Sequence, residues 1–206
     1  MTSAELLRSD LSIVAALVPE GSRVLDLGCG EGELLEHLRD RKGAFVRGVE
    51  LSSEGVAASI SRGVPVFQGD LDEGLADFRD GSFDVVVLSQ TLQVVRRPML
   101  VLREMLRVGE RGIISIPNFG HWRNRTRLGL RGRMPVSASI PYTWYETPNI
   151  HHTTIADFRD FVALAGGVVE QEVALLSETI PAKRITALPN LLADTAVFVI
   201  GRGAGA

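Results

Sequence analysis

The stretch VLDLGCGEGELL, from Val24 to Leu35, constrains the fold of this 206-residue chain more than any other. Apolar residues lead into an acid, three glycines follow at alternate positions, and leucines at helical spacing come next. This order predicts a buried strand, a tight turn and a helix. In an open parallel sheet, ligands bind beyond the carboxyl ends of the strands, where a turn of this kind lies. The turn is therefore the first candidate for a binding site.

Short apolar runs and helical patterns alternate along most of the chain. Continuous runs of Val, Ile and Leu are typical of strands that are covered on both faces of a parallel sheet. The runs that predict strands are residues 22–28, 45–51, 64–70, 83–89 and 111–117, with two more at 168–176 and 196–202. Apolar residues at i, i+3 and i+4 predict crossover helices at 32–43, 52–63 and 96–110. We expect a single α/β domain over residues 1–206.

Two segments lie outside this alternation. An amphipathic helix is expected at about residues 4–18, because leucines and valines recur there at helical spacing. The segment of about 118–155 loses the periodicity and contains both tryptophans, both tyrosines and three of the four histidines. It is expected to be an insertion after the fifth strand. Within it we predict a helix from about His121 to Leu130, with Asn118 as its cap.

Charge and cysteine content limit the class of protein. A net charge of −3 gives no reason to expect general attraction to nucleic acid or to anionic lipid. The single cysteine, Cys29, excludes an intramolecular disulfide and a zinc site built from thiolates. The N-terminal stretch lacks the pattern of a signal peptide, and no apolar run is long enough to cross a bilayer. We therefore expect a cytoplasmic protein without a membrane partner.

Two familiar uses of a glycine-rich turn do not fit this one. A mononucleotide phosphate loop needs Lys followed by Ser or Thr after its last glycine, but Glu33 and Leu34 stand there. A dinucleotide site needs G-x-G-x-x-G, whereas the third glycine here comes one residue early, between Glu31 and Glu33. Two carboxylates repel a pyrophosphate but tolerate a ligand with positive charge. The plain alternative is that the glycines only permit a sharp turn and close packing.

S-adenosylmethionine, a nucleoside with a positive centre, fits the acids at the ends of three successive strands. Asp26 is placed to receive its ammonium group, directly or through water. Glu50 follows the glycines at the separation where a carboxylate binds two ribose hydroxyls. Leu51 can then lie against the purine, while Asp70 and the Leu71 N–H serve the adenine. Taken singly, each acid is more often a solvated loop residue or a helix cap.

Four stretches, VLDLGCGEG, GVEL, GDLDEGL and FDVVVLSQTLQVV, resemble the successive motifs of class I S-adenosylmethionine-dependent methyltransferases over about residues 20–120. The resemblance implies a Rossmann-like fold: a mostly parallel seven-stranded sheet with helices on both faces and an antiparallel last strand. It also implies S-adenosylmethionine or S-adenosylhomocysteine as the cofactor. The residues that it implies for cofactor binding are Asp26, Gly28, Cys29, Gly30, Glu50, Leu51, Asp70, Leu71, Ser89 and Gln90.

The rest of the chain indicates one family within this superfamily. The stretch IPNFGHWRNRTRLGLRGRMPVSASIPYTWYETPNIHHTTIADF and the later LPNLLADTAVFV resemble the MetW family of methionine-biosynthesis proteins. This resemblance implies an accessory protein that associates with homoserine O-acetyltransferase, the MetX-type enzyme, and supports or regulates it. We expect the contact to use the insertion at 119–150. The alternative is a methyltransferase that acts on a small-molecule acceptor.

A catalytic group is hard to assign, because methyl transfer needs a general base only when the acceptor must lose a proton. The candidates closest to an acceptor are His151 and Tyr145, and the insertion also contains His121, His152 and Tyr142. Structural hydrogen bonding is the competing role for the histidines. No metal site is expected, since the adjacent His151 and His152 point to opposite sides of an extended backbone.

Arginines and aromatic residues of the insertion predict a protein interface. Five arginines lie within eleven residues, namely Arg123, Arg125, Arg127, Arg131 and Arg133. A local positive patch can steer an acidic partner, and Trp122, Trp144 and Tyr145 are of types enriched at interfaces. These aromatic residues can instead form a wall around an acceptor, and the arginines can be a solvated face. RNA is a rival partner, but the chain is acidic overall and shows no RNA-binding module.

Overall fold

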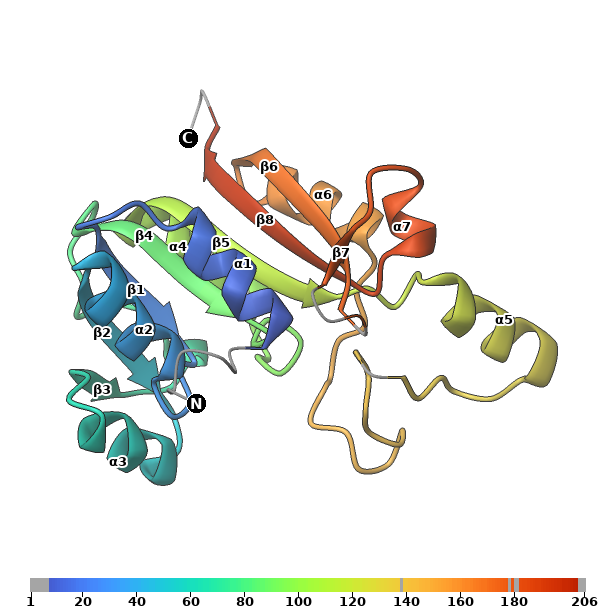
Figure 1. Cartoon of the computed structure of the whole chain (residues 1–206), viewed down its shortest axis with the longest axis horizontal. Coiled ribbons are helices and arrows are strands. Elements are labelled where there is room, and N and C mark those ends of the chain that lie inside the picture. Colours follow the sequence, from blue (N-terminus) through green and yellow to red (C-terminus); the bar gives the residue numbers. More distant parts are fainter. Residues whose placement is uncertain (1–7, 138, 178, 180–181, 204–206) are drawn as a thin grey trace.

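An eight-stranded sheet runs through the computed structural model of the chain, which describes residues 8–137, 139–177, 179 and 182–203 (Figure 1). The strands are β1 (Arg23–Leu27), β2 (Phe45–Glu50), β3 (Val66–Gln68), β4 (Phe83–Ser89), β5 (Gly109–Pro117), β6 (Gly167–Leu176), β7 (Lys183–Arg184) and β8 (Thr195–Arg202). Their order is β3-β2-β1-β4-β5-β8-β6-β7. The first five strands are parallel, and β8 is antiparallel to its neighbours β5 and β6. The predicted α/β class, with a mostly parallel sheet and an antiparallel last strand, is confirmed.

The strand count differs from the expected seven. The additional strand is β7, which has only two residues and pairs with Leu175 and Leu176 at the end of β6. It lies in the connection between β6 and β8, where the sequence shows no apolar run. A pairing this short depends on the partner strand and leaves no periodic signal of its own.

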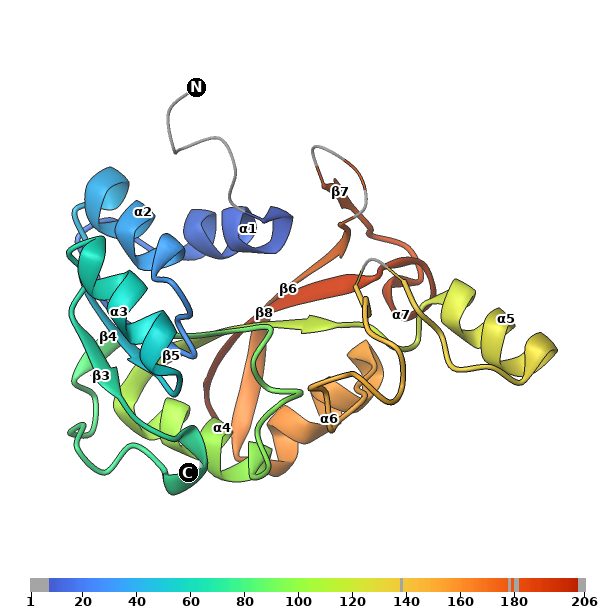
Figure 2. The ribbon, with the colours of Figure 1, turned by 90° about the horizontal axis from the view of Figure 1, so that it is seen from below.

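Helices cover both faces of the sheet. They are α1 (Ser9–Leu17), α2 (Glu33–Lys42), α3 (Ser53–Ser61), α4 (Pro98–Val108), α5 (Trp122–Arg131), α6 (Ile155–Leu164) and the short α7 (Pro189–Leu192), together with the single-turn η2 (Leu71–Glu73). Figure 2 shows α1 and α2 on one face and α4 and α6 on the other, while α5 extends away from the sheet. None of the helices in the described part of the chain is long and apolar enough to span a membrane.

The apolar runs of the central strands follow from this two-sided cover. In β4, Val85 and Val87 belong to the cluster of buried residues that includes α1 and α2 side chains. Val86 and Leu88 belong to the second cluster, with α4 and α6. Alternate residues of a strand point to opposite faces, so a strand covered on both faces is apolar throughout.

The helix predicted to begin near His121 is present as α5, but its predicted cap is wrong. The N-cap residue of α5 is His121, with no side-chain capping bond, and Asn118 has another role. The Asn118 Oδ1 accepts from the N–H groups of Gly120 (3.0 Å) and Ile155 (3.3 Å), and its Nδ2 donates to the Ala193 carbonyl at 2.7 Å. Asn118 is fully buried, so its amide satisfies buried backbone groups from three segments instead of a solvent-facing helix end.

Two further helices differ from the sequence predictions. α1 begins at Ser9, and residues 4–7 of the expected helix lie outside the described residues. α6 was not predicted, although Thr154 and Asp157 form a capping box at its start. The sequence pattern Thr-x-x-Asp before Ile155 was therefore the available signal for α6.

Candidate cofactor site at the carboxyl ends of β1 to β4

The glycine turn after β1 is shaped by left-handed backbone at three alternate positions. Gly28, Gly30 and Gly32 have φ angles of +74°, +55° and +79°. The N–H groups of Gly28 and Cys29 both donate to the Val49 carbonyl, at 2.8 and 3.1 Å, which fixes the turn against the end of β2. A side chain at Gly28 has no room, since an added Cβ would lie 2.7 Å from Thr91 atoms. The alternation of glycines is therefore a conformational requirement of this turn.

Glu50 joins the end of β2 to this turn. Its Oε2 accepts from the Gly30 N–H and its Oε1 from the Ser52 N–H, both at 2.9 Å. Each carboxylate oxygen keeps a further lone pair for another donor. Glu50 is thus oriented by backbone groups at the place predicted for the ribose acid.

Asp26 is the most perturbed acid of the site. It is 3 % exposed, and its buried Oδ1 has no hydrogen-bond partner in the described part of the chain. Burial raises the pKa of Asp26 to about 7, Arg8 opposes the rise, and Glu50 adds to it. A buried carboxylate that lacks a donor costs free energy, so the group is suited to a cationic ligand that supplies the missing hydrogen bond.

Cys29 packs inside the turn. An added Cβ at Gly48 would lie 2.4 Å from its Sγ, so Gly48 leaves the space that the thiol fills. Burial raises the pKa of Cys29 to about 12, and the thiol therefore stays protonated. Its place in the structure is that of a small packing residue rather than a nucleophile.

The predicted adenine residues lie farther along the same edge. Asp70 follows β3 by two residues and is the N-cap of η2, where its carboxylate accepts from the Asp72 N–H at 2.9 Å. Leu71 is buried, whereas the Leu51 side chain is 62 % exposed at the end of β2. An exposed leucine beside Glu50 is available to cover a flat apolar ring.

Ser89 ends β4 and Gln90 follows it, beside Arg8, Asp10 and Ser115, which the sequence analysis did not select. Gln90 has a left-handed φ of +54°, which is rare for a residue other than glycine and is typical of functional turns. The Ser89 hydroxyl donates to Asp10 at 3.1 Å, and Ser115 of β5 donates to the same oxygen at 2.9 Å. Arg8 reaches this point too, with its Nη2 3.2 Å from the Ser89 Oγ.

A cavity of about 530 Å³ adjoins the end of β4. Polar groups supply much of its lining, among them Arg8, Ser9, Gln90, Gln93, Asn149 and Thr195, and Tyr142 of the insertion also lines it. This volume is sufficient for a small molecule. The cavity lies between the start of α1, the turn after β4 and the insertion.

The candidate catalytic residues do not line this cavity. The Tyr145 side chain is 68 % exposed and packs edge-on against Trp144. His151 borders a separate cavity of about 10 Å³, and its buried Nε2 has no partner among the described residues. The His152 ring stacks on Phe119, with their centroids 4.7 Å apart. Among the histidines and tyrosines of the insertion, Tyr142 is the one that lines the cavity beside Gln90.

The acids on either side of Gly32 are partly neutralised. Arg62 of the loop after α3 lies 3.5 Å from Glu31 and 3.8 Å from Glu33, and it donates to Glu36 at 2.9 Å. Of the acids at this turn, Asp26 is therefore the one that no arginine contacts in the described residues. Glu31 and Glu33 are largely exposed, so solvent screens them further.

The arginines of the insertion are all exposed, but they are not equivalent. Arg125 donates to the Gly120 and Asn190 carbonyls, and Arg127 donates to the Val136 carbonyl. Arg131 and Arg133 make no such bond among the described residues. Arg125 thus ties the insertion to α7, Arg127 ties it to itself, and Arg131 and Arg133 are presented to solvent.

Comparison with known proteins gives the family. The sequence model described as "Methionine biosynthesis protein MetW" matches residues 8–200 of this chain. The chain belongs to the MetW family. The predicted family is therefore confirmed, and with it a place among proteins described by a role in methionine biosynthesis.

A curated relative of this MetW-family chain is the "Bifunctional methionine biosynthesis protein MetXA/MetW" of Rhodopirellula baltica. The two are 39% identical over 207 aligned positions, which cover 95% of this chain and 33% of the relative. The MetW-family chain thus spans about a third of the length of that protein.

Solved structures share the fold at lower identity. An S-adenosylmethionine-dependent methyltransferase of Mesorhizobium loti has a TM-score of 0.71 and 18% identity, covering 98% of this chain and 100% of that one. The magnesium protoporphyrin IX methyltransferase of Synechocystis, solved with bound S-adenosylhomocysteine, has a TM-score of 0.65 and 18% identity, covering 95% and 83%. The MetW-family chain therefore has the methyltransferase fold.

Proposed function

We propose that this protein binds S-adenosylmethionine or S-adenosylhomocysteine and acts in the cytoplasm as an accessory protein of a MetX-type homoserine O-acetyltransferase. The observation that carries the proposal is the 39% identity, over 95% of the chain, to a relative whose name joins MetXA and MetW. Two proteins that are fused stay at a high effective concentration relative to each other. Two separate chains stay close in the same way when they bind each other. A role beside the acyltransferase follows from this reasoning.

Cofactor binding is supported by the site itself. Asp26 has a buried oxygen that no described residue hydrogen-bonds, which fits an ammonium donor. Glu50 retains acceptor capacity for ribose hydroxyls, and the backbone of Gly28 and Gly30 permits close approach of a ligand. Asp70, Leu51 and Leu71 would hold the adenine, and Ser89 and Gln90 would lie beside the sulfur end. S-adenosylmethionine, when bound, supplies an electrophilic methyl group. In an accessory role, occupancy of the site would report the concentration of S-adenosylmethionine in the cell.

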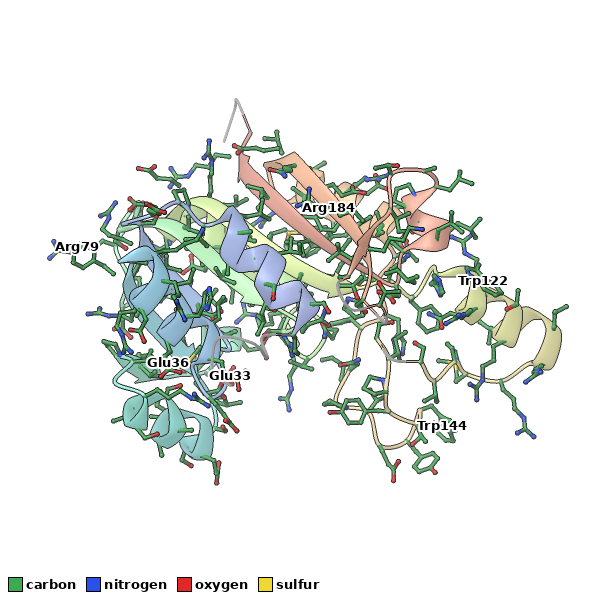
Figure 3. All side chains as sticks on the ribbon, in the orientation of Figure 1. Glu33, Glu36, Arg79, Trp122, Trp144 and Arg184 are labelled. Atoms are coloured by element: carbon green, nitrogen blue, oxygen red, sulfur yellow. The ribbon has the colours of Figure 1, made fainter. Side chains whose placement is uncertain are left out.

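The surface of the insertion supports the proposal of a protein partner. Its surface combines the exposed Trp122 and Trp144 with the exposed Arg131 and Arg133. Figure 3 shows Trp122 and Trp144 at the end of the molecule opposite Glu33 and Glu36 of α2. Aromatic residues and arginine are the types that dominate protein interfaces. The acyltransferase would then carry an acidic complementary surface.

One experiment tests the accessory role. The acyltransferase of the same organism is purified alone and with this protein, and acetyl transfer to homoserine is followed while S-adenosylmethionine or S-adenosylhomocysteine is titrated. We expect the two proteins to co-purify and the rate to change with this protein and with the nucleoside. An unchanged rate in every combination discards the accessory role.

A methyltransferase acting on a small molecule is the second candidate, and the cavity beside Gln90 is the observation that favours it. Tyr142 lines the cavity and would lie near the acceptor. Transfer of a labelled methyl group from the cofactor to a metabolite in cell extract would support this function. RNA as the acceptor is less favoured, because Arg125 and Arg127 are engaged in hydrogen bonds to backbone carbonyls of the protein.

A further inference from the structure

We infer that two copies of this protein form a symmetric dimer through an apolar hollow beside β3. The inference depends neither on the proposed cofactor nor on the acyltransferase. Figure 1 shows β3 and α3 at one end of the molecule and α5 at the other. Arg79, which follows β3 in the chain, lies opposite Trp122 and Trp144 (Figure 3). The insertion of each copy therefore stays free for another partner in such a dimer.

One face of the sheet has little cover at β2 and β3. Because β1, β2 and β3 follow one another in one direction across the sheet, right-handed crossovers place α2 and α3 together on the opposite face. The connection from β3 to β4 adds the single turn η2 and the buried Leu75 and Phe78 to the first face. Phe45 and Phe67 point to this face, as does Val49 of its buried cluster. They nevertheless stay 73 % and 45 % exposed.

A hollow of about 580 Å³, the β3 hollow, opens beside these strands, and its apolar lining includes Ile60, Pro65, Phe67 and Phe78. The Phe67 and Phe78 rings meet edge to face, with their centroids 6.3 Å apart. Ile60 of α3 is 58 % exposed, so apolar side chains from both faces of the sheet reach solvent around this hollow. A concave surface that exposes aromatic and aliphatic groups together is typical of a protein interface.

β3 lies at the edge of the sheet, and β2 is its one neighbour in the described part of the chain. An unpaired edge can add a strand from another chain, but a short edge strand and an adjacent proline oppose this. β3 has three residues and follows Pro65 directly. We therefore assign the contact to side chains of the β3 hollow and not to backbone hydrogen bonds.

Two charges of opposite sign also line the β3 hollow. Arg47 and Asp77 are both exposed, and neither forms an ion pair among the described residues. The neighbouring Arg23 and Arg39 are instead paired with acids. A surface that carries one free cation and one free anion is complementary to itself, because a two-fold axis brings Arg47 of each copy to Asp77 of the other. This charge pattern selects a second copy of the chain as the occupant of the hollow.

Two charge reversals test both the surface and its symmetry. In the dimer, Arg47→Asp places a carboxylate against Asp77 of the other copy, and Asp77→Arg places two guanidinium groups together. Each substitution occurs twice across the two-fold axis, so each should weaken dimerisation by about 10- to 100-fold in sedimentation velocity over a range of concentrations. An equimolar mixture of the two variants should recover the dimer, because each copy then supplies the charge that the other lacks.

Phe45→Ser tests the apolar part of the same contact and should also weaken dimerisation. Its matched control is Leu130→Ser on α5, where an apolar side chain is 85 % exposed at the other end of the molecule. Arg131→Asp, at an exposed arginine of α5, is the control for charge reversal. Neither control should shift the equilibrium between monomer and dimer. Thermal unfolding of every variant checks that the fold is retained.

Three results overturn the inference. The first is a wild type that sediments as a monomer at every concentration. The second is a dimer that neither charge reversal weakens, or two monomeric variants that stay monomeric when mixed, since either result places the contact on another surface. The third is a loss of acyltransferase binding by Arg47→Asp with an unchanged dimer, which assigns the β3 hollow to that partner. Recovery of the dimer on mixing cannot come from unfolded chains, so a general loss of stability does not imitate the expected pattern.

Discussion

The Glu50 carboxylate accepts a hydrogen bond from the Gly30 N–H at 2.9 Å, and so one side chain at the end of β2 holds the turn that follows β1. The same carboxylate accepts from Ser52 at the start of α3. The candidate ribose ligand is therefore also a structural tie between three segments. Changes at Glu50 are expected to affect both binding and stability.

Glu50→Gln tests this double role. We expect the affinity for S-adenosylhomocysteine to fall by about 1–3 kcal/mol, because charge-assisted hydrogen bonds to ribose are lost. The melting temperature should fall as well, since the amide has one acceptor oxygen in place of two. Calorimetry and thermal unfolding measure the two effects. Glu54→Gln, on the exposed first turn of α3, is the control, and an equal loss of affinity there would contradict the assignment.

The raised pKa of Asp26 predicts a pH-dependent stability. Its value is 3.8 in the unfolded reference and about 7 in the folded protein. Between these values the folded protein retains a proton that the unfolded chain has released, so the free energy of unfolding falls as the pH rises through this window. The contribution is fully present below the lower value and lost above the upper one.

Asp26→Asn removes this titration. Urea unfolding across the window should give a flatter profile for Asp26→Asn than for the wild type, with the difference in slope confined to the window. Binding of a ligand with an ammonium group favours the ionised carboxylate, so the wild type should release protons when it binds. Parallel slopes in the two proteins would mean that Asp26 does not titrate in this range.

Much of the fold was predictable because its determinants are local. The unbroken apolar run of β4 follows from burial on both faces, and the capping and periodic residues of α2 lie within one segment. The candidate site was predictable in part for a topological reason. Parallel strands present their carboxyl ends at one edge, so Asp26, Glu50 and Asp70 had to lie near one another.

The contacts that the sequence analysis did not predict join residues that lie far apart in the sequence. The Asp10 carboxylate is fixed by Ser89 and Ser115, which lie 79 and 105 residues along the chain. No periodicity connects such positions. Asn118 shows the related limit of capping rules: it precedes a helix, yet its burial directs its amide to other backbone groups. The roles of Asp10 and Asn118 thus follow from their burial in the folded protein, which the local sequence does not show.

Gly28→Ala should be more damaging than Gly21→Ala, although both glycines have left-handed backbone, with φ of +74° and +69°. A Cβ at Gly21 meets nothing within 4 Å, so this substitution should cost only the conformational penalty of about 1–2 kcal/mol. At Gly28 the clash with Thr91 adds to that penalty. Chemical unfolding measures the difference, and equal losses of stability would show that the turn yields to the added methyl group.

Arg131 and Arg133 are expected to steer association with the acyltransferase. Reversal of both charges, Arg131→Glu with Arg133→Glu, should slow association and remove most of its dependence on salt, because exposed charges act mainly on the rate of encounter. Stopped-flow mixing at two ionic strengths measures the effect. The variant Arg79→Glu is the control, and a similar slowing there would point to net charge in place of this patch.

Trp144 is predicted to be an anchor of the same interface. Its side chain is 73 % exposed, so Trp144→Ala should change the free energy of unfolding by less than about 0.5 kcal/mol. A buried aromatic anchor typically contributes about 2 kcal/mol or more to binding, so the complex should weaken by more than tenfold. Leu164→Ala on α6, which removes an apolar side chain with the same 73 % exposure, is the matched control for affinity measurements. If both variants bind the acyltransferase as tightly as the wild type, the contact lies elsewhere than on the insertion.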